Sequence, residues 1–71
     1  MNWEDHIASD PNILFGKPVI KDTRVPVDLI LEKLATIYSI EDLLQSYPNI
    51  TKEDIQACLL FAANMVKHEK A

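Results

Sequence analysis

The sequence has 71 residues, which is enough for one small domain. In a domain of this size, folding buries about 60% of the surface that the unfolded chain exposes. Although 48% of the residues are hydrophobic, no run approaches the roughly 18 apolar residues of a membrane span. The first residues also lack the basic region of a signal peptide. A single cysteine, Cys58, excludes an internal disulfide and a multi-cysteine metal site. We therefore expect a cytoplasmic protein that has a thin core, no membrane partner and no deep substrate cavity.

The charge of the chain is negative and unevenly distributed. Eleven acidic residues against seven basic ones give a net charge of −4, which is unusual for a protein held to DNA by electrostatics alone. Residues 17–24 are the exception, because Lys17, Lys21 and Arg24 less Asp22 leave that segment with +2. Any contact with phosphate groups is therefore expected from this short segment.

The first 24 residues predict a β and loop segment. Short strands are expected around residues 6–8 and at residues 18–21, separated by the turn signal SDPN at residues 9–12. Gly16, the only glycine, lies between the two strands, where a tight bend or a positive φ would require it. Two such strands need a helical layer to cover one face.

From residue 25 onward, apolar residues recur at helical spacing. Pro26 suits the first turn of a helix, because its missing N–H would have no partner there. The apolar stripe of this first helix contains Val27, Ile30, Leu31, Leu34 and Tyr38.

Capping residues predict where two further helices begin. Ser39, followed by Asp42, resembles an N-cap, and Pro48 ends the helix that it opens. Thr51 is expected to cap a third helix, whose first turn contains Asp54 at the end that favours acids. Residues 25–71 thus predict a tri-helical segment, and the whole chain a mainly α single domain over residues 1–71 with a short N-terminal β-hairpin.

The third helix has an apolar arc that is wider than one contact face requires. The arc spans roughly 160°, against about 100° for a single face. Its members are Ile55, Cys58, Leu59, Phe61, Ala62, Ala63, Met65 and Val66. Leu60 falls on the opposite, polar side, which is compatible with a core helix that has one exposed leucine.

A helix that packs its own core on one side and a second subunit on the other gives the same pattern. We expect this arrangement, in a homodimer or a higher homo-oligomer, because a thin core often needs a partner. The candidate residues for an oligomer or partner interface are Cys58, Leu60, Phe61 and Met65.

Groups with catalytic or metal-binding chemistry are sparse. Cys58 lies on the apolar arc, so we interpret it as a small buried hydrophobe and not as a nucleophile paired with His6 or His68. Two histidines and one cysteine at unrelated spacings do not predict a metal site. We expect no enzymatic activity and no cofactor.

The connection at residues 48–51 has the length of the turn in a helix-turn-helix motif. A DNA-reading helix presents basic or amide side chains at its start, where this chain has Lys52 and Gln56 but also Glu53 and Asp54. The candidate DNA-binding residues are Lys17, Lys21, Thr23, Arg24, Lys52 and Gln56.

The residues alone slightly favour a structural interpretation of the basic segment over DNA binding. Lysines protect solvated hairpin edges against aggregation. In that interpretation, Arg24 pairs with Asp28 and has no contact with nucleic acid.

Two blocks of the sequence resemble a known family. Residues 16–27, GKPVIKDTRVPV, resemble the signature of the bacterial and archaeal family called domain of unknown function 433. Residues 47–57, YPNITKEDIQA, are similar to its second block, and residues 9–11 fit its opening. The resemblance implies a homeodomain-like three-helix fold with a small N-terminal β element. It also implies an antitoxin of a type II toxin-antitoxin pair, because some members pair with a PIN-like ribonuclease toxin.

The chain departs from the family pattern at two places. Asp22 stands where a glycine usually precedes the Thr-Arg pair, and we expect it to bar a positive φ there. Ile37 and Tyr38 stand where a glycine is usual between the first two helices. Since the sequence ends just past the third helix, a toxin contact is expected on the folded surface, at Leu60 and the apolar arc.

Three functional hypotheses follow. The leading one is an oligomeric antitoxin that binds a toxin and also operator DNA. The alternatives are a stand-alone helix-turn-helix regulator and a self-associating module that binds no nucleic acid.

Overall fold

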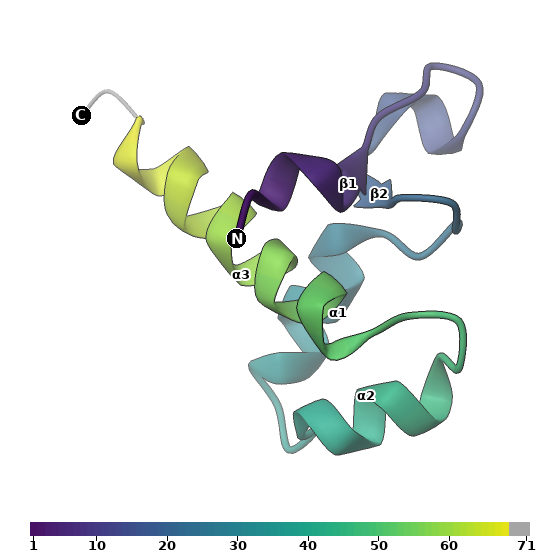
Figure 1. Ribbon diagram of the computed structural model, residues 1–71, viewed down its shortest axis with the longest axis vertical. Helices are drawn as coiled ribbons and strands as arrows, with labels where there is room; N and C mark the ends of the chain where they lie inside the picture. The colour runs from purple at the N-terminus through teal and green to yellow at the C-terminus, as the bar shows by residue number, and fades with distance from the viewer. Residues whose placement is uncertain (69–71) are drawn as a thin grey trace.

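Three helices and a two-stranded antiparallel sheet form the fold of residues 1–68, which a computed structural model describes (Figure 1). The elements in chain order are the 3-10 helix η1 (Trp3–Asp5), β1 (Ile7–Ala8), the 3-10 helix η2 (Leu14–Gly16), β2 (Val19–Ile20), α1 (Val27–Leu34), α2 (Ile40–Ser46) and α3 (Lys52–Lys67). The predicted mainly α fold, with three helices and an N-terminal hairpin, is confirmed.

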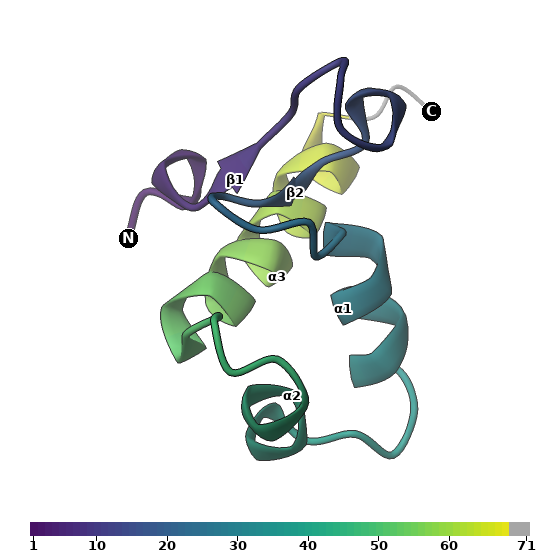
Figure 2. The same ribbon diagram turned by 90° about the vertical axis from the view of Figure 1, so that its right-hand side faces the viewer.

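The two strands form where the sequence predicts them. β1 and β2 pair so that Ile7 lies opposite Ile20 and Ala8 lies opposite Val19. The Lys21 N–H extends the pairing by donating to the His6 carbonyl at 2.8 Å. Figure 2 shows this sheet in front of α3, so the helical layer covers one face of the strands, as two short strands require.

The first helix is shorter than the sequence predicts. α1 ends at Leu34, and the Thr36 hydroxyl then donates to the Lys33 carbonyl at 2.6 Å. Tyr38 therefore lies beyond the helix and is exposed, with the Lys33 ammonium 4.5 Å from the centre of its ring. The prediction that Tyr38 belongs to the apolar stripe of α1 is wrong, because the helix stops before it reaches that residue.

Capping boxes open α2 and α3 at the predicted residues. The Ser39 hydroxyl accepts the Asp42 N–H at 3.1 Å, and the Asp42 carboxylate accepts the Ser39 N–H at 2.8 Å. Thr51 and Asp54 repeat the arrangement at 3.1 and 2.9 Å. Both helices therefore begin with two of their free N–H groups satisfied.

The core lies where β2 and the three helices meet. Its buried residues are Ile20, Val27, Ile30, Leu43, Ile50, Ile55 and Cys58. The C-terminal half of α3 projects past the other helices (Figure 1). Val66, in this half, is 70% exposed, and Leu59, in the preceding half, is 46% exposed. The neighbouring elements therefore cover a narrower and shorter face of α3 than its apolar arc.

The N-terminal residues pack against α3. Trp3, in η1, contacts Phe61 edge to face, with ring centroids 5.3 Å apart and an interplanar angle of 81°. His6 Nδ1 lies 2.9 Å from Asp54 Oδ1. These contacts join the N-terminal residues to α3, and neither contact is predicted from the sequence.

Candidate functional site

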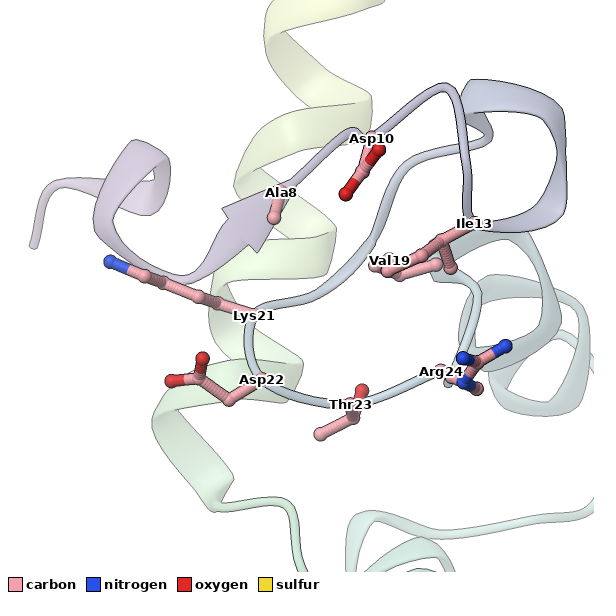
Figure 3. A pocket seen from close by; sticks show the side chains of 8 residues that line it. All are labelled: Ala8, Asp10, Ile13, Val19, Lys21, Asp22, Thr23 and Arg24. Atoms are coloured by element: carbon pink, nitrogen blue, oxygen red, sulfur yellow. The ribbon is translucent and has the colours of Figure 1, made fainter.

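An open hollow of about 430 Å³ lies beside the turn that follows β2 (Figure 3). Its lining consists of Ala8, Asp10, Ile13, Val19, Lys21, Asp22, Thr23 and Arg24. Three of the predicted DNA-binding residues, Lys21, Thr23 and Arg24, therefore lie together.

The turn itself is stabilised by Thr23. The Thr23 hydroxyl donates to the Ile20 carbonyl at 2.6 Å and accepts the Val25 N–H at 3.0 Å, so it is used within the turn. Asp22 has a φ of 64°. The prediction that Asp22 bars a positive φ is wrong, because aspartate tolerates the left-handed region better than most residues other than glycine.

The charges around the hollow balance. Lys21 and Arg24 point to opposite sides in Figure 3, with Asp22 next to Lys21 and Asp10 across the hollow. The Asp10 carboxylate accepts the Asn12 N–H at 2.9 Å, which holds it in place. Two carboxylates thus offset two cations, and the hollow offers little net attraction to a phosphate.

A second, apolar groove of about 210 Å³ lies between the segment before β2, α1 and α3. It is lined by Lys17, Pro18, Val27, Asp28, Leu31 and Phe61. Lys17 Nζ and Asp28 Oδ2 form an ion pair at 3.0 Å in this lining. The alternative pairing of Arg24 with Asp28 is therefore wrong, since Asp28 is paired with Lys17.

A strained turn precedes this groove. Leu14, Phe15 and Gly16 all have positive φ, at 50°, 57° and 83°. The positive φ confirms the expectation for Gly16, but large side chains rarely adopt it. The Ser9 hydroxyl donates to the Gly16 carbonyl and the Lys17 N–H to the Leu14 carbonyl, which holds the turn. Phe15 is left fully exposed, two residues before Lys17.

Phe15 is not among the functional residues predicted from the sequence. The available signal was a run of apolar residues, ILF at positions 13–15, inside an otherwise turn-rich segment. That run has no period of its own, so it indicates neither a strand nor a helix face.

The six candidate DNA-binding residues lie in three places. Lys21, Thr23 and Arg24 border the hollow, and Lys17 lines the apolar groove. Lys52 and Gln56 are exposed near the start of α3. Of the four cations among them, only Lys21 and Arg24 line the same cavity.

The four candidate interface residues also separate. Leu60 and Met65 are exposed on α3, whereas Phe61 is half-buried and lines the apolar groove. Cys58 is completely buried, and burial raises the pKa of its thiol to about 11. The prediction that Cys58 belongs to an interface is therefore wrong, because its side chain is part of the core. Its burial agrees with the interpretation of Cys58 as a small buried hydrophobe.

Metal ligands do not gather in the described part of the chain. Within residues 1–68, His, Cys, Asp and Glu form no group of three or more that would hold a metal ion. No helix among the same residues has the length and apolar character needed to cross a bilayer.

Residues 7–62 match the family described as "Protein of unknown function (DUF433)". This range includes the hollow, the apolar groove and the strained turn. The chain belongs to this family. The family resemblance of the two sequence blocks is thereby confirmed.

The chain is similar to one curated protein and to one solved structure. The uncharacterized protein y4eO of Sinorhizobium fredii is 36% identical over 56 residues, which make up 79% of this chain and 25% of that protein. The crystal structure of a family member from Anabaena variabilis has a TM-score of 0.83 at 25% identity, over 90% of this chain and 63% of that one. The chain thus spans about a quarter of the length of the first relative and less than two thirds of the second.

Proposed function

We propose that this chain is a protein-binding module and not an enzyme, and that it acts as the antitoxin of a PIN-like ribonuclease toxin. The toxin would seat on the apolar groove beside Phe61 and on Phe15. The observation that carries this proposal is the fully exposed Phe15 side chain, held by a left-handed turn two residues before the groove begins at Lys17.

An exposed phenylalanine in a fixed turn is a suitable anchor for a protein partner. An aromatic side chain buries on the order of 150–250 Å² when it is covered, and such residues dominate interface energetics. Because the turn already holds Phe15 in place, little conformational entropy is lost on binding. The neighbouring groove would take an apolar side chain of the partner, while the Lys17–Asp28 pair offers polar contacts.

The charge of the chain supports a ribonuclease as the partner. A ribonuclease must attract the RNA backbone and therefore presents basic groups. A chain with a net charge of −4 complements such a surface and competes with RNA for it. The same net charge, together with the balanced hollow, disfavours binding to DNA.

Co-expression with a tagged ribonuclease encoded by the adjacent reading frame tests the proposal. We expect the two chains to co-purify and RNA cleavage to be suppressed. Phe15→Ala should weaken binding at least about tenfold, which corresponds to a hot-spot residue. Ile37→Ala is the matched control, because Ile37 is 97% exposed but lies in the loop between α1 and α2 and does not line the apolar groove.

Two outcomes would contradict the proposal. A neighbouring gene product that is no ribonuclease, or that never co-purifies, removes the antitoxin role. Wild-type affinity in Phe15→Ala, or equal weakening in Ile37→Ala, removes the proposed binding surface.

A further inference from the structure

The outer face of α3 carries a stripe of side chains whose spacing is symmetric about Leu60. The stripe consists of Glu53, Gln56, Leu60, Asn64 and Lys67. These residues follow one another at intervals of three, four, four and three positions. At about 100° per residue, all of them lie within about 40° of Leu60 around the helix. Asn64 is half-buried and the other four are exposed.

The chemistry of the stripe is complementary under the same symmetry. Reversal about Leu60 places acidic Glu53 opposite basic Lys67. It also places Gln56 opposite Asn64, and each of these carboxamides both donates and accepts hydrogen bonds. Leu60 falls opposite itself. A helix with this pattern of side chains is complementary to a second copy of itself that runs in the opposite direction.

We infer that α3 pairs with α3 of a second copy of this chain, antiparallel, about a twofold axis at Leu60. A twofold axis makes the same patch serve both copies, as closed dimers require. The antiparallel direction follows from the charges: a parallel pair would place Glu53 against Glu53 and Lys67 against Lys67, and both contacts are repulsive. The inverted pair forms two attractive contacts in their place.

The length of α3 fits this arrangement. The helix has 16 residues and therefore extends for about 24 Å. Its midpoint falls between Leu59 and Leu60, so an axis at Leu60 overlaps the two helices along almost their whole length. Leu60, at the centre of the stripe, is 43% exposed. Pairing would cover this apolar surface at the centre, with the charged contacts at both ends.

The inferred dimer leaves the apolar groove free. Phe61 follows Leu60 by one residue and so lies about 100° away around the helix. Its side chain faces Trp3 and the groove with Lys17 and Asp28. The dimer contact and the proposed toxin contact therefore use different faces of α3.

Reversal of charge tests the geometry directly. Sedimentation equilibrium of the whole chain should show a monomer–dimer equilibrium for the wild type. Glu53→Lys places two basic groups at each end of the pair, and Lys67→Glu places two acidic ones there. Each variant alone should raise the dissociation constant at least about tenfold.

The decisive result is recovery when the two variants are combined. An equimolar mixture of Glu53→Lys and Lys67→Glu should form a heterodimer, because each introduced charge then faces an opposite one. The double variant should dimerise by itself for the same reason. Glu41→Lys is the matched control, because Glu41 is exposed and is the second residue of α2, as Glu53 is of α3. The control therefore reproduces the loss of stability that comes from placing a basic residue at the N-terminus of a helix.

A wild-type chain that stays monomeric up to about 1 mM overturns the inference, because a dimer with so high a dissociation constant would not form in solution at working concentrations. A mixture of the two variants that does not associate, with both variants folded by circular dichroism, overturns the antiparallel geometry. Equal dissociation by Glu41→Lys overturns the role of Glu53.

Discussion

The Asp54 carboxylate joins the first strand to the last helix by means of His6. His6 Nδ1 lies 2.9 Å from one oxygen of Asp54, and the other oxygen accepts the Thr51 N–H at 2.9 Å. The two side chains are only 29% and 16% exposed, so water competes weakly for this contact. One carboxylate therefore both caps α3 and positions β1, although 48 residues separate His6 from Asp54.

Asp54→Ala should lower the free energy of unfolding by about 2 kcal/mol, from one capping contact and one hydrogen bond to His6. Asp42→Ala is the matched control, because Asp42 has the same position in the capping box of α2 and, among residues 1–68, forms no ion pair. It should cost only about 1 kcal/mol. Urea denaturation measures both values. Equal losses would mean that the contact with His6 contributes nothing to stability.

Cys58 should make the stability depend on alkaline pH. Burial raises the pKa of the Cys58 thiol to about 11, whereas in the unfolded chain it loses its proton near about 8.5. Between these values the folded state holds a proton that the unfolded state releases, so the free energy of unfolding falls as the pH rises. At pH 10.5 the loss should reach about 2–3 kcal/mol.

Urea denaturation of wild type and Cys58→Ala at pH 8 and pH 10.5 isolates this effect, because lysines and tyrosines titrate equally in both chains. The advantage of the wild type over the variant at pH 8 should shrink or reverse at pH 10.5. Parallel pH profiles of the two chains would show that the thiol does not carry the effect.

Asp22 should respond to substitution according to its left-handed backbone. Its φ of 64° penalises residues that are branched at Cβ and costs glycine nothing. Asp22→Val should therefore lower the free energy of unfolding by about 1–2 kcal/mol, and Asp22→Gly should be at least as stable as the wild type. Thermal denaturation gives the order of the three chains. Stability of Asp22→Val equal to that of the wild type would contradict the turn geometry.

Trp3 should report on the packing of the N-terminal residues. It is the only tryptophan, and it contacts Phe61 edge to face. Phe61→Leu removes this aromatic pair, so the fluorescence emission of Trp3 should shift to longer wavelength. The free energy of unfolding should fall by about 1 kcal/mol. Phe15→Leu, at a fully exposed position, is the control and should leave the emission unchanged. A shift in the control alone would contradict the Trp3–Phe61 contact.

Local sequence signals account for most of what was predicted correctly. Ser39 and Thr51 predict the starts of α2 and α3 because a capping box involves residues only three positions apart. Gly16 predicts a positive φ because this conformation is a property of one residue. The two strands are likewise found at the expected residues.

The failures concern contacts between distant segments. The periodicity of α3 gives an apolar arc that includes Val66, but burial depends on which neighbouring elements cover that arc, and Val66 is 70% exposed. The Lys17–Asp28 pair and the His6–Asp54 contact depend on the tertiary arrangement, which residue spacing does not encode. The exposure of Phe15 depends in the same way on a turn without a periodic signal.

The docking of the N-terminal residues against α3 has a consequence for biosynthesis. Trp3 and His6 are synthesised before their partners Phe61 and Asp54, which lie about 50 residues further along the chain in α3. The core cannot close on a partly synthesised chain, so folding must wait for α3 and then proceed as one cooperative step. Until that moment, the tryptophan and the edge of β1 are available to chaperones and to proteases.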